Sequence, residues 1–194
     1  MMEYLGQSNT ELLGDRALFE EIHRLKSFFI HLFSELANDI SLDKLSEAHA
    51  ASQGVKISKG NELEHCPYQV LDIVRDFDSK AGFNIRVLNW WGRGLFVIVY
   101  TGKDNPRLMH HPGFIASMQQ REYMLAKTSS PWDYKTMIDQ EQMEVIPSVD
   151  DLNSHISRFK YFQILKKIEY TTSPHELNTR LKDQVEHILK YYVA

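Results

Sequence analysis

Apolar and polar residues alternate most clearly between residues 83 and 101, FNIRVLNWWGRGLFVIVYT. The first arm places Phe83 and Val87 on one face with polar residues between them, which is the period of a half-buried strand. The second arm, LFVIVY, is apolar on both faces, which predicts a central strand covered on both sides. Between the arms, Gly92 and Gly94 allow the positive φ angles of a tight turn. We therefore expect a β-hairpin around which the rest of the chain packs.

Apolar residues recur at spacings of three and four near both ends of the chain, which indicates amphipathic helices. Asp15 is a suitable N-cap for a helix over residues 16–38, and the polar residues 1–14 predict a loose N-terminal arm. Near the C-terminus, Ser173 and Glu176 form a capping box that opens the last helix. Since a broad apolar face indicates only that something covers it, the helix over 16–38 suits a homodimer as well as a core.

The residues between these helices predict shorter elements. In order, they are a second helix from Ser41 ended by Gly54, an edge strand over 55–59, a helix from Pro67 with the stripe Val70, Leu71, Val74 and Phe77, a helix over 112–125, a strand over 132–138, a helix from Ser148 to Phe159, and a strand over 162–168 that Lys166 and Lys167 push toward an edge. Strands and helices do not alternate strictly, and there is no internal repeat or linker. We therefore predict one α+β domain over residues 1–194, with an antiparallel sheet built around the central hairpin and helices packed on it.

Composition narrows the class of protein. The 194 residues are 43% hydrophobic and 25% charged, which is typical of a globular protein, and the net charge of −4 argues against nucleic acid as a partner. Cys66 is the single cysteine, so no internal disulfide forms, which suits a reducing compartment. We find no signal peptide and no apolar run long enough to span a bilayer, so we expect a cytoplasmic protein without a membrane partner.

His65, Cys66, His110 and His111 are the candidate catalytic residues. Cys66 precedes Pro67 at a predicted helix N-terminus, where a neighbouring histidine could activate a thiolate. An inert buried thiol explains the same cysteine. Histidines and a cysteine are also metal-ligand types, but neither HExxH nor paired CxxC is present, so we assign no metal site. The phosphate-loop motifs and GxSxG are absent as well, so the cofactor stays unknown.

Trp90, Trp91, Arg93, Tyr100 and Trp132 are the candidate ligand-binding residues. For the two adjacent tryptophans we expect packing, one on each face of the sheet. The preferred hypothesis is a non-enzymatic binding or interaction protein, with an aromatic-lined pocket for a small-molecule ligand. The first alternative is a small enzyme that uses the histidines and cysteine above, either thiol-based or metal-dependent. The second is a nucleic-acid-binding module that uses the hairpin tip.

Two segments, FNIRVLNWWGRGLFVIVYTG and RFKYFQILKKI, give the sequence a family resemblance. Over residues 16–169, the chain resembles the YktB-like family of uncharacterised bacterial proteins. There too, a helical region precedes a hairpin rich in aromatic and β-branched residues, followed by further helices and a late strand. The resemblance implies a curved antiparallel sheet packed on helices. It implies no catalytic residues, and the helix after Ser173 lies outside it.

Overall fold

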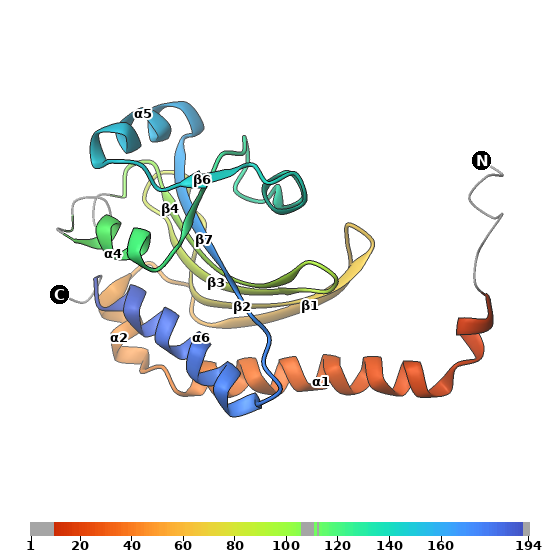
Figure 1. Cartoon of the computed structure of the whole chain (residues 1–194). Helices are drawn as coiled ribbons and strands as arrows, with labels where there is room; N and C mark the ends of the chain where they lie inside the picture. The colour runs from red at the N-terminus through yellow and green to blue at the C-terminus, as the bar shows by residue number, and fades with distance from the viewer. Residues whose placement is uncertain (1–9, 106–110, 112, 192–194) are drawn as a thin grey trace.

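The computed structural model describes residues 10–105, 111 and 113–191. Within this part of the chain, helices pack on a seven-stranded antiparallel sheet, which confirms the predicted α+β class. Figure 1 shows the sheet curving, with α1, α2 and α6 beneath it and α5 at the top of the view. The elements, in chain order, are η2 (a 3-10 helix, Thr10–Gly14), α1 (Arg16–Asn38), α2 (Leu42–Ala48), β1 (Lys56–Leu63), β2 (Cys66–Asp76), β3 (Phe83–Trp90), β4 (Gly94–Gly102), α4 (Phe114–Gln120), β5 (Met124–Ala126), η3 (a π-helix, Lys135–Asp139), β6 (Met143–Val145), α5 (Val149–Phe159), β7 (Tyr161–Ile168) and α6 (Pro174–Leu189).

The strands lie in the order β1-β2-β3-β4-β7-β5-β6. After β4 the chain forms α4, β5, η3, β6 and α5 before β7 returns and pairs with β4. Every residue of β4 is buried, and β4 is the fourth of the seven strands, as the apolar run LFVIVY predicted. The β3–β4 hairpin is also confirmed, with φ of +78° at Gly92 and +140° at Gly94. These angles favour glycine because an L side chain rarely adopts them.

The convex face of the sheet is covered by helices. Both terminal helices begin at the predicted caps: Leu18 N donates to Asp15 Oδ1 at 2.9 Å, and Glu176 N donates to Ser173 Oγ at 3.2 Å. The C-terminal half of α1 and the apolar stripe of α6 are buried against β2, β3 and β4 in one large cluster. Burial of this area supplies most of the driving force for folding.

The concave face carries a second, smaller apolar cluster. Trp90, Phe96 and Leu165 come from the sheet, while Tyr134 and Met137 come from the segment between β5 and β6 that contains η3. This face is therefore covered by a loop and one short π-helix where the other face has long helices.

The helix predicted from Pro67 is wrong, because residues 66–76 form β2. Val70 and Val74 fit a helical stripe, but β-branched residues also favour strands, and pairing with β1 and β3 satisfies the backbone of this segment. A register shift between Asp72 and Val74 places Ile73 and Val74 together in the helix-covered core, which produced the spacing that resembled a helix.

The strand predicted over 132–138 is also wrong, since residues 135–139 form η3. Asp133 Oδ1 accepts from Thr136 N at 3.1 Å, and such a side-chain cap favours a helical turn. The helix predicted over 112–125 is shorter than expected. It ends at Gln120, because Glu122 has a φ of +59°, and β5 follows.

Three boundaries differ for local reasons. Beyond α2, which ends at Ala48, the chain is irregular up to β1. β7 is an interior strand, yet β5 pairs with it only at Ile164 and Leu165. The two lysines that follow pair with β4 alone, so this end of β7 has one open side, as an edge strand has. Of the predicted N-terminal arm, residues 1–9 lie outside the described part, while residues 10–14 form η2.

Candidate functional site

The structure places three of the four predicted catalytic residues, and they lie at two ends of the molecule. His65 is exposed in the β1–β2 turn, where Glu64 and His65 have φ of 46° and 65°, and Cys66 begins β2. His111 precedes α4, and its ring centre lies 4.9 Å from that of Tyr191. In Figure 1, α4 lies on the opposite side of the view from the turn between β1 and β2. His110 lies outside the described residues. Among those described, no three acidic, histidine or cysteine side chains are grouped as metal ligands.

Cys66 instead meets Arg93 from the β3–β4 turn. Arg93 Nη1 donates to Cys66 Sγ at 2.8 Å, and its guanidinium lies 4.8 Å from the centre of the Trp90 ring. Its Nε and Nη2 donate to the two carboxylate oxygens of Asp139 at 3.2 and 3.1 Å, and this pairing raises the pKa of Arg93. Arg93 therefore ties the hairpin tip to the β1–β2 turn and to η3, and its position is fixed.

The two adjacent tryptophans lie on opposite faces of the sheet. Trp90 is fully buried in the concave-face cluster, and its indole Nε1 donates to Leu63 O at 2.9 Å. Trp91 Nε1 donates to Gln69 Oε1, which also accepts from Asn89. The indole groups and Arg93 thus already bind partners within this protein, and this arrangement does not favour a base-stacking tip.

Tyr100 and Trp132 come together, as a pocket would require, but they form a packed cluster. Their rings are 5.7 Å apart, and Phe77 meets Trp132 edge to face at 5.0 Å. The Arg86 guanidinium lies over the Trp132 ring at 5.2 Å. Arg86 also binds both oxygens of buried Asp72, through Nε at 2.7 Å and Nη2 at 3.0 Å. Arg86 is therefore the polar centre of this cluster.

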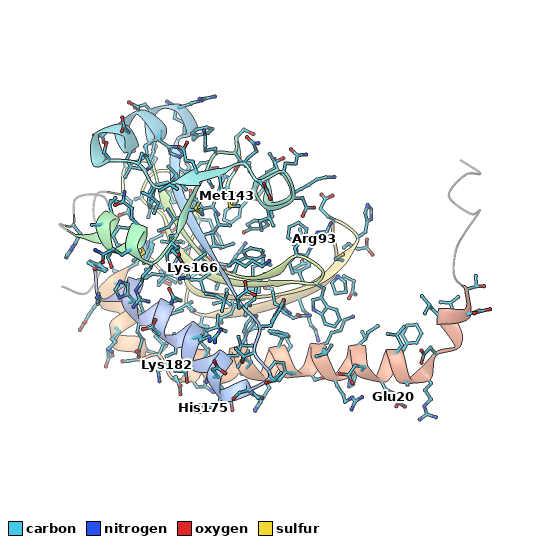
Figure 2. All side chains as sticks on the ribbon, in the orientation of Figure 1. Glu20, Arg93, Met143, Lys166, His175 and Lys182 are labelled. Carbon is cyan, nitrogen blue, oxygen red and sulfur yellow. The ribbon has the colours of Figure 1, made fainter. Side chains whose placement is uncertain are left out.

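A trough opens on the concave face beside Arg93, with a volume of about 680 Å³. Arg93, Met143 and Lys166, which line it, are labelled in Figure 2 on the β3–β4 turn, β6 and β7. We call it the Arg93 trough. Its floor is apolar and its rim is charged: the floor consists of Phe96, Met124, Ile138, Met143 and Leu165, and the rim of Arg93, Lys166, Lys167, Glu122, Asp139 and Glu141.

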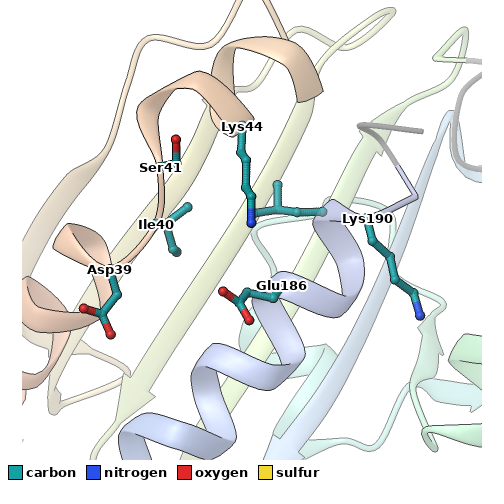
Figure 3. A pocket seen from close by; sticks show the side chains of 7 residues that line it. Asp39, Ile40, Ser41, Lys44, Glu186 and Lys190 are labelled. Carbon is teal, nitrogen blue, oxygen red and sulfur yellow. The ribbon is translucent and has the colours of Figure 1, made fainter.

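Two other hollows have a different character. One of about 610 Å³ lies between α1, β1 and β2, and most of the residues that line it are polar, among them His23, Lys26 and Asn61. The other, of about 290 Å³, lies between the start of α2 and the end of α6. Figure 3 shows Lys44 and Glu186 entering this smaller hollow from its two sides. The Arg93 trough differs from both because its apolar floor is drawn from four strands and η3.

A serine and a histidine meet between α4 and α6. Ser117 Oγ and His187 Nε2 are 2.6 Å apart. Burial, helped by Arg121 and Lys190, lowers the pKa of His187 to about 4, so the imidazole is neutral at pH 7 and accepts from the hydroxyl. The nearby Asp183 carboxylate accepts from Arg121 through both oxygens, at 2.6 and 3.4 Å. With this carboxylate held by Arg121, the pair links two helices rather than forming an oriented nucleophilic triad.

The sequence marked Arg93, which lies in the trough, as a candidate, but it did not mark the apolar residues of the trough floor. Phe96 and Leu165 read as ordinary strand residues, and Met124 and Met143 lie in strands of three residues. The order of the strands brings them together, and no local pattern reports that order. Ser117 and His187 are 70 positions apart and were equally invisible.

No protein-family model, no curated protein and no solved structure matches this chain. The resemblance to the YktB-like family therefore stays a prediction. Within the described residues, none of the helices is long and apolar enough to cross a membrane.

Proposed function

We propose that this protein is a non-enzymatic binding protein whose Arg93 trough holds an extended peptide segment with large apolar side chains. The observation that carries the proposal is an apolar floor surrounded by charges of both signs on the less covered face of the sheet. Sites of this kind take an apolar group into the centre and leave polar groups at a wet rim.

The floor combines rigid and adaptable parts. Phe96 and Leu165 are buried in β4 and β7, where strand pairing on both sides of β4 fixes their positions. Met124 and Met143 are half-buried on β5 and β6. Methionine side chains adapt to different partner shapes, and partly exposed methionines are typical of surfaces that bind varied peptides. This mixture supports apolar side chains of a peptide as the occupants of the floor.

The rim supports a ligand that carries charges of both signs. Lys167 comes from β7, while Glu122 and Glu141 come from the turns beside β5 and β6. Lys166 also lines the trough, but its Nζ already donates to Arg121 O at 2.7 Å. Such rim charges steer a partner and fix its register more than they add affinity. Arg93 acts as a wall, because each of its three nitrogens already donates to Asp139 or Cys66.

An open trough favours a peptide over the small-molecule ligand that the sequence suggested. Small-molecule sites enclose most of their ligand, whereas a peptide can cross an open surface and anchor one or two side chains. Trp132 and Tyr100, expected to line a pocket, pack against each other instead, and Trp132 also meets Phe77 and Arg86. We also propose a reducing compartment such as the cytoplasm, because the single Cys66 thiol is held by Arg93.

A random twelve-residue peptide library, displayed on phage and selected on the full chain, tests the proposal. We expect enriched peptides to share a bulky apolar residue flanked by charged ones. Isothermal titration of these peptides should show weaker binding to Met143→Glu by at least about tenfold, because a carboxylate in the floor has to lose its hydration.

Leu42→Glu is the matched control, since Leu42 is 72% exposed on α2, away from the trough. It should leave peptide affinity unchanged. Failure to enrich any sequence above an empty-surface selection contradicts the proposal. Equal affinity of the enriched peptides for wild type and Met143→Glu contradicts it as well.

A further inference from the structure

The N-terminal part of α1 extends past the edge of the sheet (Figure 1). We call residues 10–27 the α1 arm. Figure 2 labels Glu20 on it, well away from the body of the protein. Its large apolar side chains are exposed to water: Leu12 by 48%, Leu13 by 76%, Leu18 by 37%, Phe19 by 48% and Leu25 by 40%. Such a concentration of exposed apolar side chains on one element marks an interaction surface.

The exposed side chains continue a stripe that is buried farther along the same helix. Leu18, Ile22 and Leu25 are followed at the same alternating spacing of four and three by Phe29, Leu32 and Leu36. The last three are buried in the helix-covered core. A repeat of seven with apolar residues at two positions is the pattern by which helices pair. The apolar stripe suited to helix pairing therefore continues into the part of α1 that the body of the protein does not cover.

The charges of α1 select the partner and its direction. Residues 10–21 contain four carboxylates and one arginine, whereas residues 22–34 contain Arg24, Lys26, two histidines and no carboxylate. An antiparallel second copy places the acidic part of each arm against the basic part of the other. A parallel copy would place like charges together.

The existing ion pairs along the arm do not oppose this exchange. Arg16 bonds Glu20 and Arg24 bonds Glu21 within the helix, and all four side chains are at least half exposed. Exposed pairs of this kind contribute little free energy, so a partner helix can replace them.

We infer that a second copy of this chain pairs with the α1 arm, antiparallel and across a twofold axis. The antiparallel direction keeps the two sheets at opposite ends of the paired helices, so they do not collide. Tyr170, 51% exposed and 6.1 Å from the Phe29 ring, lies where the free arm begins. The N-terminal end of the partner arm reaches this position. The inference is independent of the Arg93 trough, which lies on the other face of the sheet.

Light scattering coupled to size exclusion tests the inference on the full chain. At micromolar concentration we expect twice the mass of one chain. Because Leu18 and Leu25 are exposed, Leu18→Asp/Leu25→Asp should fold normally, which circular dichroism checks, and should give the mass of one chain. Leu42→Asp, at a leucine outside the arm that is more exposed than either of these two, should keep the doubled mass.

Charge reversal tests the direction. Glu20→Lys/Glu21→Lys should raise the dissociation constant of the dimer about tenfold, because several rim pairs become repulsive. Adding Arg24→Glu/Lys26→Glu to the same chain should restore it, since antiparallel pairing again joins opposite charges. A single-chain mass for the wild type overturns the inference, as does a dimer that survives Leu18→Asp/Leu25→Asp. A dissociation constant that stays the same in both charge-reversal variants overturns the antiparallel arrangement.

Discussion

The two faces of the sheet are built differently. The convex face packs against α1, α2, α4 and α6 through a large apolar cluster. The concave face packs against one segment between β5 and β6, and its apolar cluster is smaller. It also buries a charged pair, Asp72 with Arg86, and the amide of Gln163, which is 1% exposed.

This difference assigns separate tasks to the two faces. Long amphipathic helices bury much apolar area at little polar cost, so the convex face holds the fold together. Buried polar groups stabilise a protein weakly unless every partner is present. The concave face therefore contributes less stability, and the Arg93 trough opens on it. Three predictions test the contrast, from the largest expected effect to the smallest.

Breaking the buried ion pair should have the largest effect. Asp72 Oδ1 accepts from Arg86 Nε at 2.7 Å and from Asn84 Nδ2 at 3.0 Å. Asp72→Ala leaves the guanidinium partly buried without its counter-charge. We expect the free energy of unfolding, measured by urea denaturation, to fall by about 3–5 kcal/mol.

A second variant tests whether the ion pair itself, or only the filling of its site, stabilises the protein. Asp72→Leu/Arg86→Met should recover most of that loss, because apolar residues of similar volume avoid the desolvation cost of both charges. A double variant no more stable than Asp72→Ala would show that the ion pair itself holds the concave face.

Replacing the buried amide should stabilise the protein. Gln163 lies on the concave side of β7, since Leu165 on the same strand faces that cluster, and neither polar atom of its amide has a hydrogen-bond partner. Gln163→Met keeps the length of the side chain and removes the buried polar atoms. We expect the free energy of unfolding, measured by urea denaturation, to rise by about 1–2 kcal/mol. A loss of stability would mean that the amide is satisfied in solution.

On the convex face, His187 should give the smallest effect, visible as pH dependence. Burial lowers its pKa from 6.5 to about 4 in the folded protein. Stability is full above pH 6.5 and falls as the pH drops toward about 4, because the unfolded chain takes up the proton first. In His187→Gln, the melting temperature should change less with pH between pH 6.5 and 4 than it does in the wild type. Part of the slope should remain, because burial also lowers the pKa of His155. An unchanged slope in His187→Gln contradicts the assignment.

Local chemistry made much of the fold predictable. The caps at Asp15 and Ser173 and the glycines of the central hairpin define their elements through contacts with near neighbours in the chain. The Pro67 helix and the 132–138 strand failed for the opposite reason. Their spacing fitted two structures, and strand pairing in one case and the Asp133 cap in the other decided between them.

The candidate site depended far more on tertiary structure. Arg93 was recognisable beside its glycines, but Phe96, Met124, Met143 and Leu165 form one surface because β7 pairs with both β4 and β5. The sequence also presented Tyr100 and Trp132 as pocket residues, and packing with Phe77 closed that cluster.

By itself, the sequence determined the α+β class, the two terminal helices and the central hairpin. These follow from the periodicity of side chains and from caps and turns, whose partners lie within a few residues. The tertiary structure decided the order of the strands, the faces on which Trp90 and Trp91 lie, the trough, and the point along α1 where burial stops. Contacts between distant parts of the chain set those features, and their free energy depends on the whole fold rather than on any local pattern.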